Sequence, residues 1–136
     1  MEEKQQIKES YIENDYVEFW VEGGIIIEVF KPDVTRINLA MAKQIVQDRL
    51  KVNNGKTMPL YVDLANVKSA DKEAREYFAG DDSVYLVNAS AFLLHNYVAW
   101  LLGKLFLSIN KPKATIELFR SKTKAIKWLE YYKNLN

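Results

Sequence analysis

The stretch from residue 16 to residue 30, YVEFWVEGGIIIEVF, decides the fold class. Two short runs rich in β-branched and aromatic residues, 16–22 and 25–30, stand on either side of Gly23-Gly24. A glycine pair in that place is typical of a two-residue hairpin turn, because both turn positions can need a positive φ. The sequence therefore predicts that the domain begins with an antiparallel β-hairpin, which ends at Lys31-Pro32-Asp33.

Helical and strand patterns alternate after the hairpin. From residue 34 onward Ile37, Met41 and Ile45 recur at helical spacing, and Asn53-Asn54-Gly55 supplies the stop. Residues 58–64, MPLYVDL, form an apolar run of the kind found in buried parallel strands. These patterns predict one helix followed by one central strand.

The second half continues the alternation. Ser69 is expected to cap a helix that runs to Gly80, with Asp71 and Glu73 placed in its first turn. We predict a strand at 84–87, a long apolar helix at 90–108, a last strand at 115–119 and a closing helix that starts at Ser121. Four residues share the apolar face of the closing helix: Ala125, Trp128, Leu129 and Tyr132.

The predicted order is β-β-α-β-α-β-α-β-α. Such alternation implies an α/β sandwich with a largely parallel sheet that starts in an antiparallel hairpin. A chain of 136 residues fits a single domain spanning 1–136, and we interpret residues 1–14 as a polar N-terminal extension.

Composition excludes several classes of site. The chain has no cysteine, which rules out disulfides and thiolate metal sites, and His95 is its one histidine. We expect no metal and no cofactor. The first nine residues are charged and polar without an apolar signal region, so we expect a cytoplasmic protein.

Charge is unevenly distributed along the chain. Residues 1–30 hold eight acidic residues against two lysines, a net −6, and residues 104–136 hold eight basic residues against two glutamates, a net +6. This asymmetry fits a nucleic-acid or membrane face, or attraction between the two ends of the chain. Because a nucleic-acid footprint usually makes the whole domain basic, we favour attraction between the ends and expect no nucleic-acid partner.

Residues 83–103 contain no Asp, Glu, Lys or Arg, and the stretch is long enough to span a bilayer. Asn88, Ser90, His95 and Asn96 interrupt it, and Asn88-Ala89-Ser90 is interpreted as a strand-to-helix turn. We therefore favour a buried strand followed by a core helix over a transmembrane segment.

The predicted helix at 90–108 is apolar on nearly every side. A small two-layer domain rarely covers such a helix completely, so the excess surface suggests a homodimer contact, a pocket for a lipid-like ligand or a membrane-facing patch. We favour the homodimer. The residues proposed for the contact or pocket are Phe92, Tyr97, Trp100 and Leu101.

The closing helix begins with two lysines, which the helix dipole disfavours. Two interpretations are open. The helix tolerates the small unfavourable effect of the lysines, or the lysines belong to an anion-binding site at the helix N-terminus. The residues proposed for such a site are Arg120, Ser121, Lys122 and Lys124.

Catalytic patterns are absent from the sequence. No phosphate-binding glycine loop, nucleophile elbow or HExxH motif is present. Asp63 and Asp71 are the one candidate acid–base pair, but aspartates at strand ends and helix starts commonly bond backbone N–H groups. His95, placed in the apolar helix, is interpreted as a core or interface residue. We predict a non-enzymatic protein.

Two stretches resemble the SpoIIAA-like branch of the STAS superfamily. One is 61–67, YVDLANV, which is similar to the strand and loop before that family's regulatory helix, and the other runs from Lys111-Pro112 to Trp128-Leu129. The resemblance implies the family's fold and a protein-interaction function. It places Asp71-Lys72 where the antagonist proteins have Asp-Ser, so the phosphorylated serine is missing and no phosphoswitch is expected.

The resemblance also suggests an interaction surface. Its residues are Asn66, Lys68, Ser69, Asp71, Lys72 and Arg75. The first functional hypothesis is thus a regulatory domain that binds another protein. The alternative is a carrier or sensor of an amphipathic small molecule or lipid, acting in solution or at a membrane surface.

Overall fold

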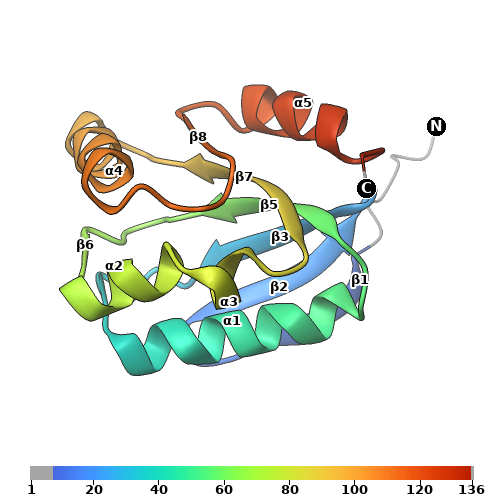
Figure 1. Ribbon diagram of the computed structural model, residues 1–136, viewed down its shortest axis with the longest axis horizontal. Coiled ribbons are helices and arrows are strands. Elements are labelled where there is room, and N and C mark those ends of the chain that lie inside the picture. The colour runs from blue at the N-terminus through green and yellow to red at the C-terminus, as the bar shows by residue number, and fades with distance from the viewer. Residues whose placement is uncertain (1–7, 136) are drawn as a thin grey trace.

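A central six-stranded sheet separates α1 and α2 on one face from α5 on the other in the computed structural model, which describes residues 8–135 (Figure 1). The strands are β1 (Glu9–Glu13), β2 (Val17–Glu22), β3 (Ile25–Phe30), β4 (Arg36–Ile37), β5 (Met58–Asp63), β6 (Ser69–Ala70), β7 (Val87–Leu93) and β8 (Ile116–Phe119). The helices are α1 (Leu39–Asn53), α2 (Lys72–Phe78), α3 (Asp81–Val84), α4 (Tyr97–Asn110) and α5 (Lys122–Tyr132).

The sheet order β1-β2-β3-β5-β7-β8 confirms the predicted architecture. β2 and β3 form the antiparallel hairpin, in which Gly23 and Gly24 both have positive φ, and β3, β5, β7 and β8 are mutually parallel. The sequence did not predict β1. This strand lies within residues 1–14, the segment interpreted as a polar extension, and it pairs with β2. Residues 1–7 of that segment lie outside the described residues.

Two asparagines set the ends of α1, one through its side chain and the other through its backbone. Asn38 accepts a hydrogen bond from the Met41 N–H at 2.9 Å, and Asn54 ends the helix in the left-handed conformation at φ 48°. The predicted stop is therefore confirmed, whereas the helix begins after Ile37 and not at residue 34. Ile37 instead belongs to β4, which pairs with β6 in a separate two-stranded sheet.

The expected cap at Ser69 is wrong. Ser69 lies in β6 beside Arg36, and α2 begins after Asp71, which occupies the cap position in extended conformation. The Asp71 carboxylate accepts a hydrogen bond from Arg36 Nε at 2.6 Å. It therefore forms an ion pair with Arg36 and does not cap α2 through a backbone N–H group.

The boundaries predicted between residues 81 and 110 are also wrong. Residues 81–84 form the short helix α3, and the strand lies at 87–93 because Ser90 pairs with Leu60 and with Ile116 on its two sides. Asn96 caps the following helix by accepting from the Ala99 N–H at 2.8 Å. Asn88-Ala89-Ser90 is therefore a central strand segment, and the turn lies at His95-Asn96.

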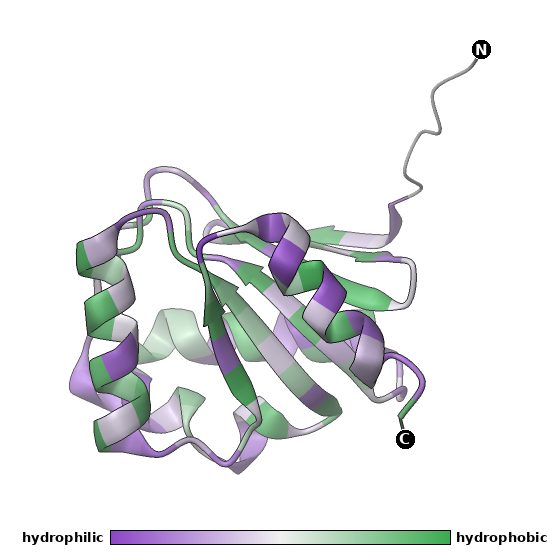
Figure 2. Cartoon of the chain, turned by 90° about the horizontal axis from the view of Figure 1, so that it is seen from above, coloured by the Kyte–Doolittle hydropathy of each residue, from purple (hydrophilic) through white to green (hydrophobic). Residues whose placement is uncertain are grey.

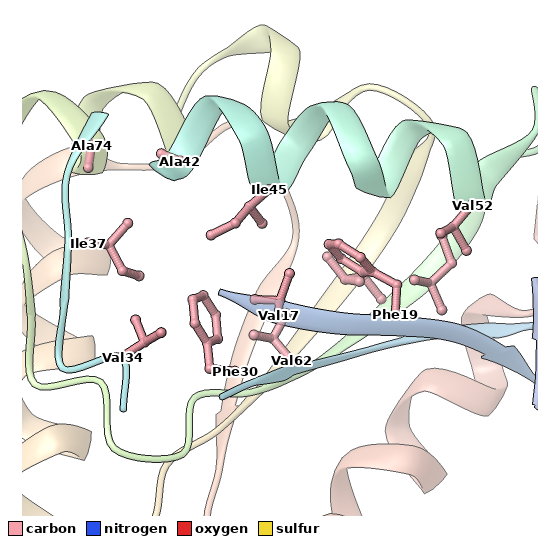
Figure 3. Close-up of a cluster of buried hydrophobic side chains, with 12 residues drawn as sticks. Val17, Phe19, Phe30, Val34, Ile37, Ala42, Ile45, Val52, Val62 and Ala74 are labelled. Carbon is pink, nitrogen blue, oxygen red and sulfur yellow. The ribbon is translucent and has the colours of Figure 1, made fainter. Parts of the chain in front are cut away.

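Alternation along the strands divides the core in two. On the α1 face, Val17, Phe19, Phe30 and Val62 point from the sheet toward Ile45 of α1 (Figure 3). The opposite face packs a second cluster against Ala125 and Leu129 of α5, as the periodicity of the closing helix predicted. The site described below depends on the α1 face alone.

Residues 83–103 are divided among α3, β7 and the first half of α4. Within residues 8–135, no helix combines the length and the apolar character needed to cross a bilayer.

Asn53 closes the junction between α1 and β5. Its side-chain amide is completely buried and donates to the carbonyl oxygens of Lys56 and Leu86, both at 2.9 Å. The Leu86 carbonyl also accepts from the Met58 N–H at 3.1 Å, so Asn53 reinforces the point where β5 and β7 begin side by side.

We expect Asn53→Ala to lower the free energy of unfolding by about 1–3 kcal/mol, because it removes the acceptor of the buried Arg49 Nε and the donor to the Lys56 carbonyl. Urea denaturation measures the change. Gln47→Ala on the exposed side of α1 is the control and is expected to change stability by less than about 0.5 kcal/mol. Equal stability of the two variants would show that the Asn53 amide contributes nothing.

Candidate functional site: a cavity beneath α4

Helix α4 covers the sheet incompletely. None of its 14 residues is buried, and Tyr97 and Val98 are 59% and 65% exposed. Figure 2 shows hydrophobic residues around much of this helix, which lies beside the sheet and apart from α5. This apolar helix therefore lies against the domain without being enclosed by it.

Gly103 fixes the closest approach of α4 to the rest of the domain. A Cβ atom at this position would lie 3.1 Å from methyl carbons of both Leu94 and Leu118. A glycine inside a helix costs about 1 kcal/mol relative to alanine, and the close contact explains why it is placed here.

A cavity of about 410 Å³ lies between α4 and the α1 face of the sheet. Its floor includes Leu60, Val62 and Phe92 of the sheet, while Leu102 and Phe106 of α4 form the opposite wall. Side chains of α1 and α2 close the remaining sides, and one side is partly open to solvent. Small-molecule sites in proteins have volumes of about 300–1,000 Å³ and are mostly apolar.

Glu28 places a carboxyl group in this apolar surrounding. It lies on β3 between Ile26 and Phe30, so strand alternation turns it toward α1, and only 5% of its surface is exposed. Burial raises the pKa of Glu28 to about 7, although the nearby Arg49 lowers it. The carboxyl group accepts no hydrogen bond from the described residues.

Arg49 is the charged neighbour of Glu28 on α1, and it is 2% exposed. Its guanidinium donates to the carbonyl oxygens of Ser83 and Tyr85 and to Asn53 Oδ1. These contacts hold the guanidinium against the chain leading into β7. It therefore compensates the charge of Glu28 from a distance, without a direct ion pair.

A second acceptor in the cavity wall also lacks a partner. Asn110 ends α4, and its Oδ1 atom is buried with no hydrogen-bond donor among the described residues. Ser90 contributes a hydroxyl from the floor. The cavity thus combines large apolar walls with a few polar groups.

Half of the predicted interaction surface borders this cavity. Lys68, Ser69 and Arg75 line it, and Lys68 forms no ion pair with any described residue, whereas Arg75 donates to the Ala70 carbonyl oxygen. The other three residues of that surface lie outside the cavity and have polar partners: Asn66 with the Pro32 carbonyl, Asp71 with Arg36, and Lys72 with Glu76.

The proposed anion site lies apart from the cavity. Ser121 caps α5 by accepting from the Lys124 N–H at 3.3 Å, as expected for the closing helix. Because α5 packs on the opposite face of the sheet, the cations of this helix N-terminus cannot serve a ligand in the cavity. The remaining members of the set are Arg120, which is exposed, and Lys122, whose Nζ lies 5.9 Å from the Tyr61 ring centroid.

Of the four residues predicted for an apolar contact or pocket, only Phe92 lines the cavity. Tyr97 and Trp100 stack on each other with ring centroids 6.0 Å apart, and Leu101 is 46% exposed. These three residues lie on the part of α4 that faces away from the cavity.

His95 lies outside the helix in which the sequence placed it. It occupies the turn after β7, where its Nε2 is 2.6 Å from Asp63 Oδ1 at the neighbouring strand end. Asp63 and Asp71 each have a different partner and do not form an acid–base pair. Among residues 8–135, no group of three His, Cys, Asp or Glu side chains could hold a metal ion.

Sequence reasoning missed Glu28 and Arg49. A signal for Glu28 was present, since the acid interrupts IIIEVF at the same parity as Ile26 and Phe30. Arg49 follows Ile45 by four residues and so shares its helix face. Neither pattern reveals that α4 leaves a space beside the two residues.

The arrangement of elements defines a SpoIIAA-like fold. A solved structure of an uncharacterised protein of the DUF3478 family from Shewanella loihica PV-4, described as having that fold, is similar to this chain with a TM-score of 0.57. The similarity covers 94% of this chain and 99% of the other, at 9% sequence identity, and it confirms the resemblance found in the sequence.

The chain belongs to the DUF7793 family, a domain of unknown function, whose family model matches residues 19–133. No curated protein has significant sequence similarity to the chain.

We expect Glu28→Gln to increase stability at about pH 8 by up to about 3 kcal/mol, at roughly 1.4 kcal/mol per unit of pKa difference. At low pH the carboxyl is neutral in the folded and unfolded chains alike, so burial has no ionic cost. As the pH rises above 4.5, the ordinary value, and through about 7, the folded chain loses stability because it must bury a carboxylate.

Denaturant unfolding of both proteins at about pH 5 and about pH 8 measures this effect, which the linkage relation predicts to be larger at the higher pH. Glu117→Gln, at an exposed position on β8, is the matched control. A stability difference that is the same at both pH values would contradict the assigned ionisation of Glu28.

Proposed function

We propose that this domain binds a small apolar or amphipathic molecule in the cavity beneath α4, as a carrier or a sensor. The observation that supports this most strongly is the cavity itself, about 410 Å³ in volume and bounded by apolar side chains from four parts of the chain. A ligand that covers these apolar walls removes their surface from water, which is favourable.

The energetics favour a ligand with a substantial apolar part. Each methylene group removed from water contributes about 0.8 kcal/mol, so a chain of about ten carbons contributes on the order of 8 kcal/mol before the costs of association. The partly open side of the cavity supplies an entrance without requiring the core beneath α1 to separate.

A second candidate is protein–protein contact, including a homodimer, through the outer side of α4. It is supported by the exposed apolar residues of that side, chiefly Tyr97, Val98 and Leu101. The family resemblance supports the loop and helix from Asn66 to Tyr77 as a further contact. Subunit number in solution tests the homodimer, and a cytoplasmic location stays a prediction.

We expect Ser90→Leu to weaken binding of the neutral fluorescent probe N-phenyl-1-naphthylamine about ten-fold or more. The leucine side chain extends from the floor of the cavity and displaces the equivalent of about two methylene groups of ligand, each worth about 0.8 kcal/mol. Fluorescence titration measures the dissociation constant of the probe.

Ser108→Leu makes the identical substitution on the exposed side of α4, away from the cavity, and is expected to leave the dissociation constant unchanged. Equal binding by both variants, or weaker binding only in Ser108→Leu, would place the probe on the outer surface and refute the cavity as its site.

A further inference from the structure

Two hydrogen-bond acceptors without partners lie in the same cavity. One is the carboxyl group of Glu28 on β3, which is 5% exposed and receives no hydrogen bond from residues 8–135, and the other is the fully buried Asn110 Oδ1 at the end of α4. They come from opposite walls, so their shared lack of a donor does not arise from one local feature of the chain. The inference drawn from them rests on the proposed function and specifies its ligand.

A buried acceptor without a donor is unfavourable by about 1–3 kcal/mol, and more when the acceptor is charged. Within the described residues, no side chain supplies a donor to Glu28, and its strand neighbours Phe19 and Val62 are apolar. A ligand that brings a donor to this position recovers the lost interaction. A ligand that brings another acceptor increases the penalty.

The charged residues around the cavity determine which kind of hydrogen-bond donor a ligand can bring to Glu28. Arg49 on α1 already compensates Glu28, and α2 contributes Arg75 to the lining, while Tyr77 of the same helix faces Arg49. Lys68 adds a further positive charge near the opening. A ligand cation would meet an excess of positive charge, and a carboxylate would place a second acceptor beside the first.

We propose that the ligand is an uncharged apolar molecule bearing a hydroxyl group, and that this hydroxyl donates a hydrogen bond to the Glu28 carboxylate. Long-chain and cyclic alcohols share this chemistry. The apolar part of the molecule fills the space between α4 and the sheet, and Asn110 Oδ1 is available to a second donor on the same molecule.

The test displaces bound N-phenyl-1-naphthylamine from the wild-type protein with decan-1-ol, decyl methyl ether or decanoate at about pH 8.5. At that pH the carboxylate accepts hydrogen bonds but has no proton to donate. We expect decan-1-ol to bind about ten-fold more tightly than the ether, which lacks a donor, and more tightly than decanoate.

Two variants at one position separate hydrogen bonding from charge. Glu28→Gln keeps an acceptor for the alcohol but adds an amide N–H that the ether oxygen can accept, so it is expected to reduce the preference for the alcohol without reversing it. Glu28→Leu removes the acceptor and is expected to bring the two affinities within about two-fold of each other. Glu117→Leu on exposed β8 is the control and should retain the wild-type preference.

Equal affinity of the wild type for alcohol and ether, or tighter binding of decanoate, overturns the assignment of a hydroxyl ligand while leaving the cavity function in place. Persistence of the alcohol preference in Glu28→Leu overturns the role of Glu28. If the wild type binds no probe at all, the cavity function fails and this inference fails with it. The wild-type series decides the outcome even if a Glu28 variant does not fold.

Discussion

Arg49 lies near the middle of α1 with its guanidinium enclosed by the protein, where it donates to Asn53 and to the carbonyl oxygens of Ser83 and Tyr85. A buried charge is costly unless hydrogen bonds compensate its desolvation, so α1 and the segment entering β7 must keep the relative positions that allow these contacts. This requirement fixes one side of the cavity. Three nitrogen atoms of the Arg49 guanidinium donate hydrogen bonds to Asn53, Ser83 and Tyr85, and none donates to Glu28.

The opposite side of the cavity has no comparable anchor. α4 approaches the sheet through apolar contacts, closest where Gly103 meets Leu94 and Leu118, and buries none of its residues. One wall is therefore held by a dense polar network and the other by a small apolar contact area. Local stability follows the density of such contacts, so α4 is the element that can move most cheaply to admit a ligand.

Local chemistry made much of the fold predictable. Gly23-Gly24 fixed the hairpin, Asn54 ended α1 and Ser121 began α5, and each depends on residues adjacent in sequence. The prediction failed between residues 81 and 110, because the buried strand β7 and the apolar helix α4 both have continuous apolar sequences. Asn88 and Ser90 were read as a turn, although strand pairing on both sides of β7 places them in the sheet.

The candidate site was harder to predict than the fold. Phe92, which the sequence suggested for an apolar contact or pocket, lines the cavity from β7, and the position of Glu28 was visible in the strand alternation. The cavity itself depends on how far α4 stands from the sheet, a tertiary distance that no short sequence pattern encodes. The pairing of His95 with Asp63 was missed for the related reason that it requires two strand ends to be neighbours.

The most direct test is methyl NMR spectroscopy of the labelled protein during titration with N-phenyl-1-naphthylamine, whose rings shift the resonances of nearby methyl groups. The account predicts large shifts for Leu60, Val62 and Leu102, which line the cavity, and none for Ile25 or Leu129 on the α5 face. Shifts confined to exposed residues of α4 or to the α5 face, or the absence of any shift, would contradict it.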